Sequence, residues 1–117
     1  NVTIDASGGG GASGNIPIDI QNGTYTFVSG DAGRIKAKNN TTAYTYTLNN
    51  SVFVAGDWFS VANFSNTSNI TIARGTGVSL YYAGSTNNGN RVVAPRGVAT
   101  VFMESASVGY VLGSGVG

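Results

Sequence analysis

The chain has 117 residues, of which 9% are charged, and its formal net charge is +1. Such a weak positive charge argues against a general nucleic-acid binder, whose binding domain would be strongly basic. The sequence contains neither Cys nor His, which excludes disulfides, thiolate metal sites and the usual Ser–His or Cys–His catalytic pairs.

Residues 1–14 are predicted to form an N-terminal arm and hinge. Val2–Ala6 alternates apolar and polar residues as a short strand does, and the glycine-rich Ser7–Gly14 that follows opposes regular structure, because glycine loses much backbone entropy on ordering. Val2 and Ile4 are the candidate attachment residues, which would add a strand to a sheet edge in this molecule or in a neighbour. A frayed terminus or a linker stub is an alternative of equal weight.

Residues 15–117 are predicted to be a single β-sandwich domain. Short runs rich in β-branched and aromatic residues follow one another, and each run is closed by Gly, Asn, Ser or Pro. Asn22-Gly23 favours a type I′ hairpin between Ile16–Ile20 and Thr24–Val28. This spacing leaves no room for helices and is typical of consecutive antiparallel strands. We therefore expect an all-β fold, a compact antiparallel β-sandwich or barrel of about nine to eleven short strands.

Half of the positive charge lies on one short run of residues. Strand alternation in Arg34–Asn39 places Arg34, Lys36 and Lys38 on the same face. This is a candidate polar or basic contact face for an acidic polymer or an acidic capsid patch. A solvated strand surface that discourages edge pairing is the more common role of such a face.

Two predicted strands, Trp58–Phe64 and Val98–Glu104, carry apolar side chains on both faces. A strand that is apolar on both sides is usually covered on both sides, and in a small domain another copy of the chain would supply the second cover. The candidate oligomer interface consists of Trp58, Phe64, Phe102 and Tyr110. Alternatively, aromatic residues near loops would stack on sugars; these are Trp58, Tyr81, Tyr82 and Tyr110.

The carboxylates do not suggest an active site or a metal site. Four of the five acidic residues lie in or beside turns and arms, where Asp makes local hydrogen bonds, and Glu104 stands at a strand end. No Asp-x-Asp spacing is present, and the glycine-rich segment lacks the Lys-Ser/Thr of a phosphate loop. We therefore expect neither enzymatic activity nor a metal or other cofactor.

An ordered series of turns and strands from about Tyr25 to Gly113 carries a family resemblance. Its parts are SGDAGR, TAYTYTLNN, FSVANFSNTSNITIARGTGVSL, NRVVAPRGVATVFMES and the closing GYVLGSG. The series resembles a small β domain recurrent in tailed-bacteriophage virion proteins, namely head decoration proteins, head-fibre proteins and tail-fibre tips. The resemblance implies a compact β-sandwich assembled as a homotrimer. Tyr44 and Tyr46 stand where aliphatic residues are usual, which implies a wider core or a hydroxyl group that reaches solvent.

Composition and resemblance together lead to a non-enzymatic accessory structural protein of a phage virion. The expected form is a trimeric capsid decoration, cement or head-fibre domain on the extracellular surface of the particle. Its partners would be further copies of itself and other virion proteins, such as the major capsid or tail protein. The first alternative is a tail-fibre tip or receptor-binding module that recognises a host surface glycan. The second is a subunit of an extracellular surface filament with Val2–Ala6 as a donated strand. No apolar run has the length of about 18 residues that a membrane-spanning helix needs, so a membrane partner is not expected. Because the net charge is only +1, a nucleic-acid partner is not expected either.

Overall fold

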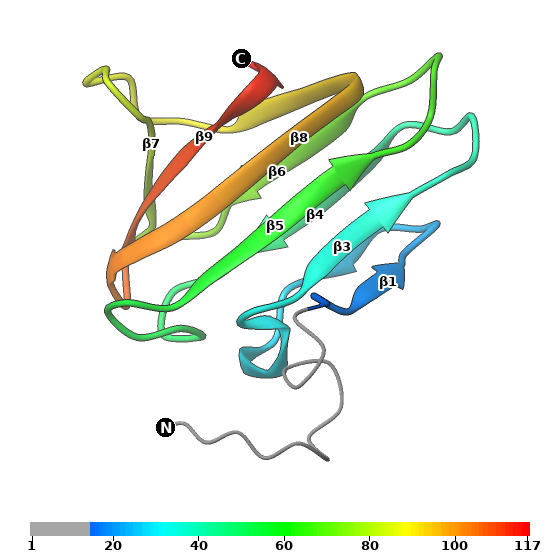
Figure 1. Cartoon of the computed structure of the whole chain (residues 1–117). Coiled ribbons are helices and arrows are strands. Elements are labelled where there is room, and N and C mark those ends of the chain that lie inside the picture. The colour runs from blue at the N-terminus through cyan, green and yellow to red at the C-terminus, as the bar shows by residue number, and fades with distance from the viewer. Residues whose placement is uncertain (1–14) are drawn as a thin grey trace.

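The structure is a computed structural model that describes residues 15–117. Within these residues the chain is all-β, as predicted, with nine strands and one 3-10 turn over Ser29–Asp31 (Figure 1). The strands are β1 (Ile18–Ile20), β2 (Tyr25–Thr26), β3 (Ile35–Lys38), β4 (Tyr44–Leu48), β5 (Trp58–Asn63), β6 (Ile70–Arg74), β7 (Ser79–Tyr82), β8 (Arg91–Ser105) and β9 (Val108–Val116). The predicted arm over residues 1–14, with Val2 and Ile4, lies outside the described residues.

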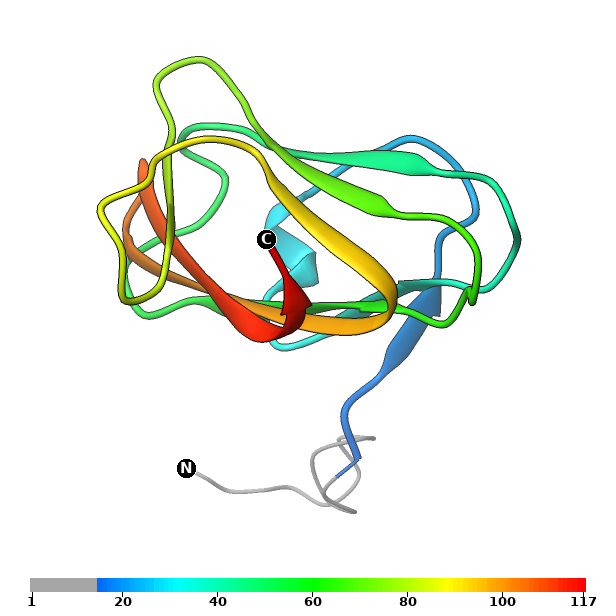
Figure 2. The same ribbon diagram turned by 90° about the horizontal axis from the view of Figure 1, so that it is seen from above.

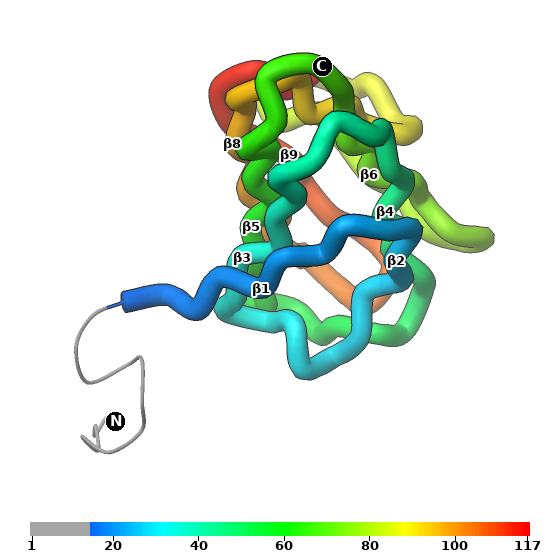
Figure 3. Tube along the Cα trace, turned by 90° about the vertical axis from the view of Figure 1, so that its right-hand side faces the viewer, coloured from blue at the N-terminus to red at the C-terminus, as the bar shows by residue number. Residues whose placement is uncertain are grey.

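The first six strands build two parallel stacks. β1, β3 and β5 pair in parallel, with Ile18 beside Ile35, and β2, β4 and β6 pair in the same way, with Tyr25 beside Tyr46. Figure 3 shows β1, β3 and β5 on one side of the molecule and β2, β4 and β6 on the other. The chain therefore alternates between the two stacks along a solenoid-like path, in which each coil pairs with the next.

This arrangement corrects the predicted antiparallel sandwich or barrel. Asn22-Gly23 does not close a hairpin, because β1 pairs with β3 and β2 pairs with β4 rather than with each other. The turn instead carries the chain across from one stack to the other. Parallel neighbours need a long return path, and the strand on the opposite stack forms part of that path here.

The bent strand β8 connects the two stacks. Arg91–Val93 pairs with β6, whereas Val98–Phe102 pairs with β5, both in antiparallel order. The segment Pro95-Arg96-Gly97 bends one continuous strand, with a positive φ of 64° at Arg96. β9 then pairs antiparallel with β8 and parallel with β7. Figure 2 shows the resulting two layers from above.

The core fills the space between the layers. Phe59 and Val61 of β5 and Val101 of β8 point inward and are fully buried, as their alternation predicts. The ring centroids of Phe59 and Phe27 are 4.3 Å apart. Tyr46 is also buried, and its hydroxyl donates a hydrogen bond of 2.6 Å to the Gln21 carbonyl oxygen, so the hydroxyl finds its partner inside the protein rather than in solvent. Burial raises the pKa of Tyr46 to about 12.

Candidate functional site

The outward side of the sheet formed by β1, β3, β5, β8 and β9 is apolar, and we call it the outer sheet face. Because side chains alternate along a strand, the residues between the inward-pointing core positions point out, and the register brings them together across strands. Trp58 lies beside Phe102, and Ala62 lies beside Val98. Six large apolar side chains on this face are 36–52% exposed: Ile18, Ile20, Trp58, Val98, Phe102 and Leu112. The hydrogen-bonded pair of Ser60 and Thr100 also lies on this face, between these apolar residues. Exposed apolar side chains gathered in this way are typical of an interaction surface.

Four aromatic residues form a row across one end of the outer sheet face. The register places Trp58, Phe102, Tyr110 and Tyr81 in this order on β5, β8, β9 and β7. The ring centroids of Phe102 and Tyr110 are 5.5 Å apart in a T-shaped arrangement, and those of Tyr81 and Tyr110 are 5.8 Å apart. Such pairs stabilise one another beyond their burial, so the row is an ordered surface.

The structure brings together three of the four candidate interface residues. Trp58, Phe102 and Tyr110 are consecutive members of the aromatic row. Phe64 directly follows β5 at the strand end opposite Trp58 and is 40% exposed. Met103, the neighbour of Phe102, is buried in the core. The alternation of β8 therefore assigns Phe102 to the outer sheet face.

The predicted basic contact face is corrected, because two of its three residues point into the protein. Lys36 is 7% exposed and Lys38 is fully buried, since their register partners on β5, Val61 and Asn63, are inward-pointing residues. Arg34, at the start of β3, keeps a side chain that is 39% exposed. The three residues share a face, as predicted, but this is the inner face of the sheet.

The inner basic residues belong to a network of ion pairs and hydrogen bonds. Arg34 donates two hydrogen bonds to Asp19, of 2.8 Å from Nε and 3.0 Å from Nη2. Lys36 Nζ lies 3.2 Å from Asp19 Oδ2 and 3.0 Å from Asp31 Oδ1, and 4.7 Å from the centroid of the Tyr25 ring. The Arg34 guanidinium and the Lys36 ammonium hold the pKa of Asp19 well below its usual range. We call Asp19, Tyr25, Asp31, Arg34 and Lys36 the inner polar network.

Lys38 is held separately from this network. Its ammonium donates to the Thr42 carbonyl oxygen and to Ser68 Oγ, and it lies 5.7 Å from the centroid of the Tyr44 ring. Burial lowers the pKa of Lys38. In the sequence, Asp19 was the signal for charged residues on the inner face. It stands between Ile18 and Ile20, so strand alternation puts either its carboxylate or the two isoleucines inside.

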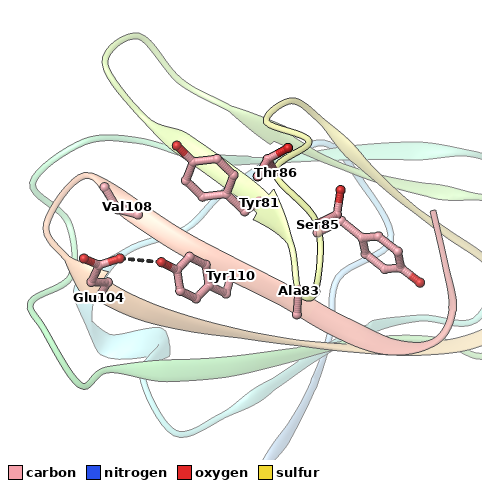
Figure 4. Close-up of a pocket in the computed structure, with 9 residues that line it drawn as sticks. Tyr81, Ala83, Ser85, Thr86, Glu104, Val108 and Tyr110 are labelled. Atoms are coloured by element: carbon pink, nitrogen blue, oxygen red, sulfur yellow. Dashed lines mark hydrogen bonds between the residues drawn. The ribbon is translucent and has the colours of Figure 1, made fainter.

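A cleft adjoins the aromatic row at β7. It has a volume of about 1040 Å³, and Tyr81, Tyr82, Glu104 and Tyr110 contribute to its lining. Figure 4 shows the labelled side chains around this space, with the Tyr110 hydroxyl turned toward Glu104. That hydroxyl donates a hydrogen bond of 2.6 Å to Glu104 Oε1, and this bond raises the pKa of Tyr110. Tyr81 and Tyr82 were named from the sequence as possible sugar-stacking residues. No sequence pattern near them predicted that Glu104 would line the same cleft.

Two further classes of site can be addressed for the described part of the chain. Within residues 15–117, no three side chains of the His, Cys, Asp and Glu types gather closely enough to hold a metal ion. Over the same range, no helix combines the length and the apolar character needed to cross a membrane. Compared with known proteins, the chain matches no protein-family model and no curated protein sequence.

Proposed function

We propose that this chain is a non-enzymatic structural domain of a tailed-phage virion, exposed on the particle surface and assembled as a homotrimer through its outer sheet face. The outer sheet face is the observation that carries the proposal. It gathers six of the large apolar side chains that the described part of the chain leaves exposed on one side of one sheet. The resemblance to virion β domains supports both the threefold assembly and the phage origin.

The energetics favour association of copies over exposure of this face. Full burial of a large apolar side chain contributes about 1.5–3 kcal/mol, and the six exposed side chains are already about half buried in the monomer. Covering the remainder is therefore worth on the order of 5–9 kcal/mol per subunit, which is comparable with the cost of association. With a formal net charge of +1, little long-range repulsion opposes assembly. We expect trimers whose population depends on concentration.

Light scattering coupled to size-exclusion chromatography tests the assembly. The wild-type chain at micromolar concentration should elute with three times the mass of the 11.9 kDa monomer. Phe102→Glu places a charge in the centre of the aromatic row and should shift the protein to the monomer without unfolding it. Val54→Glu is the matched control, because Val54 is 64% exposed in the loop before β5 and lies off the outer sheet face. A wild-type chain that is monomeric at all concentrations would refute the trimer.

On the particle, we favour a capsid decoration or head-fibre position with residues 1–14 as the attachment segment. A weakly charged domain preceded by a glycine-rich stretch suits anchoring on a shell. Deleting residues 1–14 should leave the domain folded and reduce its incorporation into particles, as measured by circular dichroism and by mass spectrometry of purified virions. If the shortened chain fails to fold, the segment belongs to the domain and the attachment role is wrong.

A receptor-binding module at a tail-fibre tip is the second candidate function, and the cleft beside Tyr81 favours it. This cleft combines tyrosine rings with hydroxyl and carboxylate groups, which is the composition of a site for a small polar ligand. Tyr81 and Tyr110 belong to both the aromatic row and the cleft, so assembly that covers the whole row would restrict access of a ligand to the cleft. Imaging of the native particle with an antibody against this chain distinguishes a head position from a tail position.

A further inference from the structure

We propose that the cleft beside β7 is a binding site for a neutral carbohydrate chain. The cleft lies between β7, the loop that follows it and the ends of β8 and β9 (Figure 4). Its volume of about 1040 Å³ is at the upper end of the range for ligand sites. This inference does not depend on the trimer, because all lining residues come from a single chain.

The aromatic side of the cleft is ordered before any ligand arrives. Tyr81 and Tyr110 are register partners on β7 and β9, and their rings contact each other at 5.8 Å between centroids. The hydrogen bond from Tyr110 to Glu104 holds the second ring in place. Tyr81 is half-buried and so presents part of its ring to the cleft. Sugar rings offer apolar C–H groups on their faces, and a fixed aromatic ring covers such a face at low entropic cost.

The polar side of the cleft supplies hydrogen-bonding groups for hydroxyls. Glu104 Oε1 accepts a hydrogen bond from the Tyr110 hydroxyl, and the two carboxylate oxygens have lone pairs for further donors. Ser85 and Thr86 add hydroxyl groups from the loop after β7. This loop is tied back to its strand, because Asn88 Oδ1 accepts a hydrogen bond of 2.8 Å from the Leu80 amide. Within the loop, Ser85 Oγ accepts a hydrogen bond of 3.0 Å from the Asn87 amide.

Charge and shape restrict the class of ligand. Among the residues that line the cleft, Glu104 is the sole formally charged group at neutral pH, and no Lys or Arg is present. An acidic polysaccharide would therefore meet a negative charge with no compensating cation. A quaternary ammonium needs aromatic rings around a compact space, whereas Tyr81 and Tyr110 contact each other along one wall of a large cleft. A neutral, hydroxyl-rich chain fits both observations.

Glycan binding by the full-length chain tests this site. The probes are an array of neutral glycans together with maltohexaose, cellohexaose and chitohexaose, and the comparison ligands are choline and polygalacturonate. We expect at least one neutral glycan to bind, and its affinity, measured by calorimetry, to fall about tenfold in Tyr81→Ala. Glu104→Gln should also weaken binding, since it removes the charge that strengthens the hydrogen bonds. Val54→Ala is the control, because Val54 is 64% exposed, does not line the cleft and lies off the outer sheet face.

Each contrary result overturns the proposal. Binding to no neutral glycan, or binding that Tyr81→Ala and Glu104→Gln leave unchanged, removes the cleft as a carbohydrate site. Binding of choline or polygalacturonate in place of neutral glycans would assign the cleft to another class of ligand. Tyr81 is substituted rather than Tyr110, because Tyr110 also belongs to the candidate interface. Light scattering on Tyr81→Ala shows whether assembly is unchanged, so that failure of the cleft and failure of the trimer can be told apart.

Discussion

The two faces of the sheet at β1 and β3 reverse the usual placement of charged and apolar residues. On the inner face lie Asp19 and Lys36, whereas on the outer face Ile18 and Ile20 are 52% and 48% exposed. Farther along the same sheet, β5 buries Phe59 in the ordinary way. Because β1 and β2 form the first coil of the described chain, the inner polar network closes the end of the core where no further coil stacks on it. In this part of the sheet, the charged residues therefore stabilise the fold from the inner face, and the apolar residues of the outer face remain accessible for contacts.

The largest effect is expected from breaking the inner polar network at Asp31. This carboxylate is 3% exposed, pairs with Lys36 and accepts hydrogen bonds of 2.8 Å from the Tyr25 hydroxyl and 2.9 Å from the Val28 amide. Asp31→Ala leaves the Tyr25 hydroxyl and the Val28 amide without this acceptor and removes one of the two carboxylates that pair with Lys36, so it should lower the free energy of unfolding by about 3–5 kcal/mol. Urea denaturation followed by tyrosine and tryptophan fluorescence measures the change.

Asp57→Ala is the matched control for that measurement. Asp57 also accepts a hydrogen bond from a backbone amide, that of Val54 at 3.0 Å, but this bond is exposed. Its loss should cost about 1 kcal/mol or less. Equal losses in the two variants would mean that the inner polar network contributes no more than an ordinary loop hydrogen bond.

A smaller, pH-dependent effect should come from Asp19. Its pKa lies well below the usual value of about 3.9, because Arg34 and Lys36 stabilise the carboxylate. The folded state therefore binds this proton less readily than the unfolded state. The stabilisation is complete above about pH 4 and is lost as the pH falls from there toward the folded-state pKa. Asp19→Asn should flatten the decline of the urea midpoint between about pH 4 and pH 2.

The sequence predicted the strands and their alternation better than their partners. The predicted strand Trp58–Phe64 matches β5 to within one residue, and the predicted strand Val98–Glu104 lies within β8. Alternation has the same period in parallel and antiparallel sheets, so it does not tell which strand pairs with which. The Asn22-Gly23 turn was correctly placed, but a turn of this type does not reveal whether the chain returns beside its own strand or crosses to another layer.

The candidate site was predictable in part for a related reason. Alternation shows that Arg34, Lys36 and Lys38 share a face, but the inner position of Lys36 goes with its contacts to Asp19 and Asp31, which alternation does not reveal. The apolar character of both faces of Trp58–Phe64 and Val98–Glu104 did indicate an outer sheet face, and the structure places Trp58 and Phe102 of these strands on it. The cleft required β7 and β9 to lie side by side, a pairing that no local pattern predicts.

The smallest effect on stability is expected on the outer sheet face itself, and it separates folding from assembly. Ile18→Thr keeps a β-branched side chain on a strand position that is 52% exposed, so the free energy of unfolding of the monomer should change by no more than about 0.5 kcal/mol. The same substitution at Ile72, which is fully buried in β6, introduces a hydroxyl into the core and should cost about 2 kcal/mol or more.

Both changes are made in the Phe102→Glu background, which is expected to be monomeric, and are measured by urea denaturation. In the wild-type background Ile18→Thr should instead raise the dissociation constant of the trimer, seen by light scattering over a dilution series. If Ile18→Thr destabilises the monomer as much as Ile72→Thr does, Ile18 is part of the folding core and the outer sheet face does not extend to β1.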